Sequence, residues 1–93
     1  MEHLTELRTI KQEVMQMDFN YKDVHRIMCL VYRCKSLFED TYPVPNKEIA
    51  LDQTKRVIAE DVSQLIQSDS EEAIRESFNQ VLDNFKIVLN FIN

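Results

Sequence analysis

The stretch SEEAIRESFNQVLDNFKIVLNFI, residues 70–92, decides the fold of this 93-residue chain. Its apolar residues recur at steps of three and four, the spacing that gives a helix one apolar face. It is the most hydrophobic segment of the sequence, so we expect it to be the main contributor to the core. The residues of its expected apolar face are Ile74, Phe78, Val81, Leu82, Phe85, Val88, Leu89 and Ile92.

Three segments upstream have the same periodicity and are predicted to be amphipathic helices. Together with the last segment they cover about residues 2–17, 21–40, 47–67 and 70–92. Each helix is expected to turn one line of apolar side chains toward the others. The expected lines are Leu4, Leu7, Ile10, Val14 and Met17 in the first helix, Val24, Ile27, Val31, Cys34 and Phe38 in the second, and Leu51, Ile58, Val62, Leu65 and Ile66 in the third.

Short polar stretches separate these segments and contain typical helix-start signals. Asn20 and Asn46 each precede a helix, where an asparagine side chain can cap the free backbone N–H groups. Ser68 and Glu71 have the spacing of a capping box at the start of the last helix. Two prolines within residues 41–46 break the helical pattern and predict an extended link.

The chain contains no glycine. Glycine-rich phosphate loops and glycine-flanked nucleophile elbows are therefore excluded, because both need the backbone freedom that glycine supplies. Short connectors between helices favour antiparallel neighbours. The sequence predicts a single all-α domain over residues 1–93, folded as an antiparallel up-down four-helix bundle. A three-helix core with a loosely docked N-terminal helix is the alternative, because the first segment is the shortest.

The net charge is −5 and is unevenly distributed. Residues 1–46 carry six basic and seven acidic side chains, whereas residues 47–93 carry five and nine. An acidic protein repels phosphate backbones, so general nucleic-acid binding is disfavoured. We recognise no stretch that is apolar and long enough for a membrane span, and no secretion signal. We expect a cytoplasmic protein.

Cys29 and Cys34 lie five positions apart in the second predicted helix. Five residues rise about 7.5 Å along a helix, so these two thiols cannot form a disulfide with each other. Reduced thiols, typical of intracellular proteins, are expected, with an intermolecular disulfide as the alternative. Cys34 falls on the apolar line and is expected to be inert. Cys29 lies outside that line near basic residues, which leaves a redox role open.

No metal or catalytic site is predicted. His25 and Cys29 stand four apart, which is half of a zinc site, but no second His/Cys pair completes it. The histidines lack the Glu-x-x-His pattern of di-iron bundles. Adjacent carboxylates point about 100° apart on a helix and do not converge on one substrate atom. We therefore expect no cofactor, no metal and no enzymatic activity.

Two surface features are candidates for partner contact. Lys22, Arg26 and Arg33 have spacings of four and seven, which place them on one face of the second helix. Such a basic stripe suits an acidic partner, and charge balance against a neighbouring acidic helix is the alternative. Ile87 and Phe91 stand four apart, off the main apolar face of the last helix. They are either part of wider core packing or a surface for protein contact or self-association.

These features favour a small binding module without catalysis that engages one protein partner. In general type the chain is similar to compact acidic helical proteins that neutralise toxins or bacteriocins, or that block host enzymes for a phage. No motif assigns it to a family. The expected function is that of a stoichiometric inhibitor, neutraliser or adaptor of one protein partner, and a homodimer is a further alternative. The alternative is a nucleic-acid-associated regulator that uses the basic face of the second helix.

Overall fold

The computed structural model describes residues 2–40 and 43–92, and these residues contain helices and no strands. The elements are α1 (Glu2–Met15), α2 (Tyr21–Glu39), α3 (Lys47–Arg56), the π-helix η1 (Val57–Val62), α4 (Ser63–Gln67) and α5 (Glu71–Leu89). η1 joins α3 to α4 without a break, so these three elements form one long helix. The described part of the chain therefore has four helical rods.

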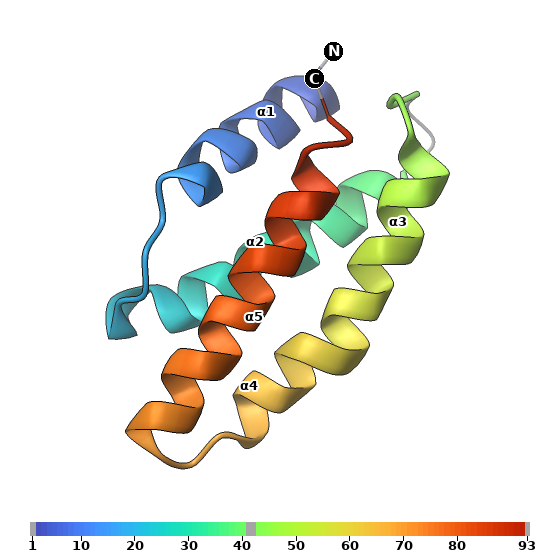
Figure 1. The fold of residues 1–93 in the computed structure, drawn as a ribbon. Coiled ribbons are helices and arrows are strands. Elements are labelled where there is room, and N and C mark those ends of the chain that lie inside the picture. The colour runs from blue at the N-terminus through green and yellow to red at the C-terminus, as the bar shows by residue number, and fades with distance from the viewer. Residues whose placement is uncertain (1, 41–42, 93) are drawn as a thin grey trace.

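Consecutive rods run in opposite directions, which gives an up-down arrangement (Figure 1). α5 lies in the centre of the view, between α1 and the long helix, and α2 passes behind it. α5 contacts every other rod, so the apolar face of residues 70–92 is the common packing surface of the bundle. The prediction of an all-α four-helix bundle is confirmed.

α1 is an integral part of this bundle, so the alternative with a loosely docked first helix does not describe the structure. Its buried residues are Leu7, Ile10 and Val14, and it packs against both α2 and α5. The Lys11 ammonium also donates a hydrogen bond to the carbonyl of Ile92 at 2.8 Å. Burial of an aliphatic side chain contributes about 1.5–3 kcal/mol relative to exposure, so these residues hold α1 in place.

α5 buries more side chains than any other helix, as its sequence predicts. Phe78 and Phe85 of α5, with Phe38 of α2, are the largest fully buried side chains. Ile74, in the early part of the helix, is only half-buried. The core is therefore centred on the aromatic middle of α5.

The third predicted helix is interrupted by η1, which changes the side chains that face the core. At its end the backbone N–H of Ser63 reaches the carbonyl of Ile58, five residues earlier. In a π-helix, residues five apart lie on nearly the same face, whereas an α-helix would rotate them by about 140°. Val57 and Val62 are consequently both buried.

A regular α-helical period predicts that one line of side chains through residues 51–66 faces the core. This prediction is partly wrong. Ile66 is 64% exposed, and Leu51 and Ile58 are only half-buried. The π-helix adds one residue to a turn, so the core-facing positions before it are displaced from those after it. The buried residues of the rod before and at the start of η1 are Ala50, Thr54 and Val57.

The two predicted asparagine caps differ in outcome. The side-chain oxygen of Asn20 accepts a hydrogen bond from the backbone N–H of Lys22 at 2.9 Å, so this cap is confirmed. The side chain of Asn46 makes no capping bond to α3. This residue adopts a left-handed backbone conformation with φ 58°, and its side-chain amide donates to the carbonyl of Phe91 at 3.0 Å. Asn46 therefore ties the link before α3 to the turn after α5.

The predicted capping box at Ser68 is wrong. The hydroxyl of Ser70 caps α5 instead, because it accepts from the backbone N–H of Ala73 at 3.1 Å. The Ser68 hydroxyl lies 2.8 Å from that of Ser77 on the next helix. Ser68 therefore joins α4 to α5 rather than starting a helix.

The helix bounds differ from the predicted ones at several ends. α1 ends at Met15 and α5 at Leu89, so both are shorter than their apolar patterns. Met17 and Ile92 lie beyond these ends but are still buried. The predicted link at residues 41–46 is described only from residue 43, and residues 41 and 42 lie outside the described part.

Candidate protein-binding surface

Arg26 and Arg33, predicted as part of a basic stripe, form ion pairs between α2 and α1. The Arg26 guanidinium donates two hydrogen bonds to the Glu13 carboxylate, at 2.7 and 2.8 Å. Arg33 donates in the same way to Glu6, at 2.5 and 2.7 Å. Two parallel N–H···O bonds are the strongest geometry for an arginine–carboxylate pair. Both arginine charges are thus balanced within the bundle.

The ion pairs alter the acidity of the two carboxyl groups. Hydrogen bonds from Arg33 hold the pKa of Glu6 below its ordinary value, and partial burial opposes this effect. Arg26 lowers the pKa of Glu13 in the same way. The folded chain therefore binds protons at these two sites less readily than the unfolded chain does.

Acidification is expected to weaken the contact between α1 and α2. A carboxyl group with a lowered native pKa stabilises the fold above its ordinary value of 4.5, and loses this contribution as the pH falls through the native value. We expect the double variant Glu6→Gln/Glu13→Gln to lose less stability than the wild type between about pH 5 and pH 3. The difference will be small, because half-exposed ion pairs are screened by solvent. Urea unfolding at each pH measures it, and parallel pH profiles for the two proteins would contradict it.

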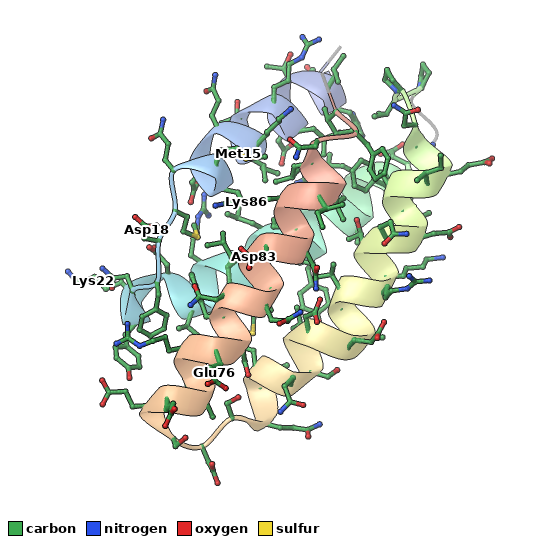
Figure 2. The ribbon with its side chains drawn as sticks, in the orientation of Figure 1. Met15, Asp18, Lys22, Glu76, Asp83 and Lys86 are labelled. Atoms are coloured by element: carbon green, nitrogen blue, oxygen red, sulfur yellow. The ribbon has the colours of Figure 1, made fainter. Side chains whose placement is uncertain are left out.

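Lys22 differs from the two arginines in its contacts. It belongs to the first turn of α2, and Figure 2 shows its side chain pointing away from the bundle. Its ammonium makes no ion pair to any residue in the described ranges 2–40 and 43–92. The three predicted basic residues therefore do not form one free positive face, and their role in partner contact stays a prediction.

Ile87 and Phe91 are separated by the structure. Ile87 is 55% exposed on α5, whereas Phe91 is half-buried against the core. α5 ends at Leu89, so Phe91 belongs to the turn after the helix and not to a continued helical stripe. Of the two predicted roles, packing against the core describes Phe91. Ile87 remains an exposed apolar side chain at the surface.

Ile87 lies at a polar groove of about 260 Å³ between α5 and the long helix. Asn84 and Asp61 bridge this groove, where the Asn84 amide donates to the Asp61 carboxylate at 2.8 Å. Its other lining residues are Gln53, Arg56, Val57, Glu60 and Gln80. The groove is mostly polar and is partly closed by its own hydrogen bond, so it offers little apolar contact area.

The solvent-facing side of α2, here called the outer α2 face, is a stronger candidate for contact. We define it by His25, Met28, Cys29, Tyr32 and Ser36, which line a shallow hollow of about 480 Å³ together with Arg33. Tyr32 is 48% exposed, and Met28 is partly packed on the core. Tyrosine, methionine and arginine are enriched in protein interfaces, whereas aspartate and glutamate are depleted.

The outer α2 face carries no acidic side chain, although the chain has a net charge of −5. Between residues 21 and 36 the only acidic residue is Asp23, which is half-buried in the first turn of α2. The signal for this face is visible in the sequence as uncharged residues opposite the apolar line of the second helix. These residues form neither a charged stripe nor a second apolar stripe.

The two cysteines have different environments. Burial raises the pKa of the Cys34 thiol to about 12, so this thiol stays protonated at neutral pH. Cys29 is an exposed free thiol on the outer α2 face. Its sulfur lies 3.3 Å from Nε2 of His25, one helical turn earlier. Only Cys29 is available for chemistry at the surface.

The described part of the chain contains no set of three or more His, Cys, Asp or Glu side chains placed to hold a metal ion. It also contains no helix of the length and apolarity needed to cross a membrane. No family model matches the chain, and comparisons with curated proteins and with solved structures found no match.

Proposed function

We propose that this protein is a non-catalytic binding module whose protein partner docks on the outer α2 face. The observation that carries the proposal is the composition of this face, with exposed Tyr32, His25 and Cys29 around a shallow hollow and no carboxylate among them. Aromatic and sulfur-containing side chains give large contact area at low desolvation cost, and tyrosine is a frequent hot-spot residue.

The ion pairs at one edge of the face support the same proposal. Arg26 and Arg33 keep about half of their side-chain surface exposed while they bind Glu13 and Glu6. Arg33 lines the hollow, and Arg26 lies two turns earlier on α2, so their exposed guanidinium N–H groups can donate further hydrogen bonds to a partner. Because their charges are compensated, the outer α2 face attracts phosphate backbones weakly, which argues against the alternative of a nucleic-acid regulator.

Within this class we propose a stoichiometric inhibitor, neutraliser or adaptor that acts in the cytoplasm. An acidic protein that covers a partner with one helix face needs no pocket and no catalytic group. The exposed free thiol of Cys29 is compatible with a reducing compartment.

Comparison of two variants at similarly exposed large side chains, Tyr32 and Ile87, tests the proposal. We expect Tyr32→Ala to reduce binding of the partner about thirtyfold, since a tyrosine hot spot contributes about 2 kcal/mol. Ile87→Ala, on α5, is the matched control and is expected to bind like the wild type. Quantitative capture from a lysate of the native host, followed by titration with the captured protein, measures both.

Thermal unfolding of each variant first establishes that the bundle is intact. Unchanged capture by Tyr32→Ala would contradict the proposal. Loss of the same captured protein only with Ile87→Ala would place the contact at the groove between α5 and the long helix.

A further inference from the structure

We propose that His25 and Cys29 form half of a tetrahedral zinc site, and that the same two residues of a second copy of this chain complete it. The two copies would meet through their outer α2 faces around a two-fold axis. This site goes beyond the proposed function, because it needs no other protein. Only its consequence, that the metal closes the face to another partner, rests on the proposed function.

The geometry of the pair matches two ligands of one tetrahedral ion. Zinc binds cysteine sulfur at about 2.3 Å and histidine nitrogen at about 2.0 Å, and a tetrahedral angle then separates the two ligand atoms by about 3.5 Å. The observed separation between Cys29 Sγ and His25 Nε2 is 3.3 Å. Both side chains are exposed on consecutive turns of α2, so little rearrangement is needed for an ion to replace their hydrogen bond.

One copy cannot complete the site by itself. A closed zinc site needs four ligands, and in residues 2–40 and 43–92 no third His, Cys, Asp or Glu side chain converges on His25 and Cys29. Cys34 is buried and points into the core, so it cannot contribute. A two-fold axis duplicates the pair and supplies a Cys₂His₂ set, which is a common structural zinc set.

The surface around the pair can accept a second copy. A two-fold contact places the same patch on both sides, so any uncompensated charge on it meets its own copy and repels it. The outer α2 face has no carboxylate, and its neighbouring arginines Arg26 and Arg33 are already paired with Glu13 and Glu6. Two thiolates also neutralise the charge of one Zn²⁺ ion, so the completed centre adds no net charge to the interface.

The two-fold axis would pass midway between His25 and Cys29, with the two α2 helices antiparallel. Tyr32 of each copy would then lie opposite the Tyr21 end of α2 in the other copy. Tyr21 and Tyr32 are both about half exposed, at 51% and 48%. Aromatic side chains in this position add apolar contact beside the metal. The shallow hollow of about 480 Å³ at the centre of the face leaves room for this packing.

The test is a titration of the purified full chain with Zn²⁺ and with Co²⁺, in a non-thiol reductant. We expect a dimer in sedimentation velocity, one metal ion per two chains, and the intense visible absorption of tetrahedral Co²⁺ with thiolate ligands. A chelator should restore the monomer.

His25→Ala and Cys29→Ser should each lower the affinity for the metal more than about a hundredfold, because loss of an outer-shell partner alone costs up to about that factor. Ile87→Ala, an exposed position on α5 and outside this face, should behave like the wild type.

Absence of metal binding would overturn the proposal, as would one metal ion per chain with a persistent monomer. A dimer that resists the chelator and disappears with stronger reductant would be a disulfide through Cys29, which also overturns it. The capture experiment on Tyr32→Ala, run with chelator present, tests the proposed function separately. The wild type is expected to retain the partner in that experiment, although the chelator has removed the metal.

Discussion

Deletion of Asn79 from α5 will abolish cooperative thermal unfolding, whereas deletion of Ala59 from η1 will preserve it. Both side chains are exposed, so neither deletion removes a core contact directly. Removing one residue from an α-helix rotates all later residues by about 100° relative to the earlier ones. Without Asn79, Phe85 and Leu89 can no longer share the core with Phe78, and the packing surface common to all rods is lost.

Deletion of Ala59 is expected to restore a regular helical register instead of disturbing one. The reason is that η1 contains one residue more than an α-helix with the same number of turns. Its loss makes Val57 and Val62 four residues apart and restores α-helical hydrogen bonding. The buried positions of this rod then follow steps of four and three, the pattern of a continuous amphipathic helix. They are Ala50, Thr54, Val57, Val62 and Leu65.

Circular dichroism during thermal unfolding measures both deletions. We expect a helical spectrum and a sigmoidal transition for the protein without Ala59, and a weak, non-cooperative change for the protein without Asn79. Equal loss of the transition in both proteins would show that η1 does not act as an added residue in the register. A normal transition without Asn79 would contradict the central role of α5.

Phe85→Ala is expected to reduce the free energy of unfolding by about 3–5 kcal/mol, because it removes a fully buried aromatic ring and leaves a cavity. Domains of this size are stable by only about 5–15 kcal/mol, so the variant loses a large share of its stability. Urea unfolding followed by circular dichroism measures this difference.

Two variants near the end of the chain are controls for Phe85→Ala. Ile87→Ala changes an exposed side chain two positions later and is expected to alter stability by less than about 0.5 kcal/mol. Phe91→Ala, in the half-buried turn after α5, is expected to fall between the two. A cost at Ile87 equal to that at Phe85 would place Ile87 in the core and would also remove its use as a surface control.

The sequence-based predictions are accurate where the structure depends on local periodicity, and they are wrong where it depends on contacts between distant residues. The apolar face of α5 is predicted almost completely, because one regular period continues through it. The inner line of the third helix is partly wrong, because a π-helix changes the period at Val57 and no residue type signals that change. Asn46 has the residue type of a cap, but a hydrogen bond to Phe91, 45 positions away, uses its side chain instead.

The candidate surfaces show the same division. The sequence places Arg26 and Arg33 on one face of α2, and this placement is correct, but it cannot show that Glu13 and Glu6 of α1 lie within hydrogen-bond distance. Ile87 and Phe91 have equivalent positions in a helical pattern, and the early end of α5 makes them different. The contact between His25 and Cys29 can be expected from the sequence and is present in the structure, because residues four apart on one helix are neighbours.

By itself, the sequence determined that this chain is helical, where its four rods lie and which side of most rods is apolar, because periodicity and most connectors are local properties. Only the tertiary structure decided which charges are compensated, where the register of the long helix changes and that Ile87 is exposed while Phe91 is half-buried. These features depend on the neighbouring rod, and the side chains that meet across two rods are far apart in the chain.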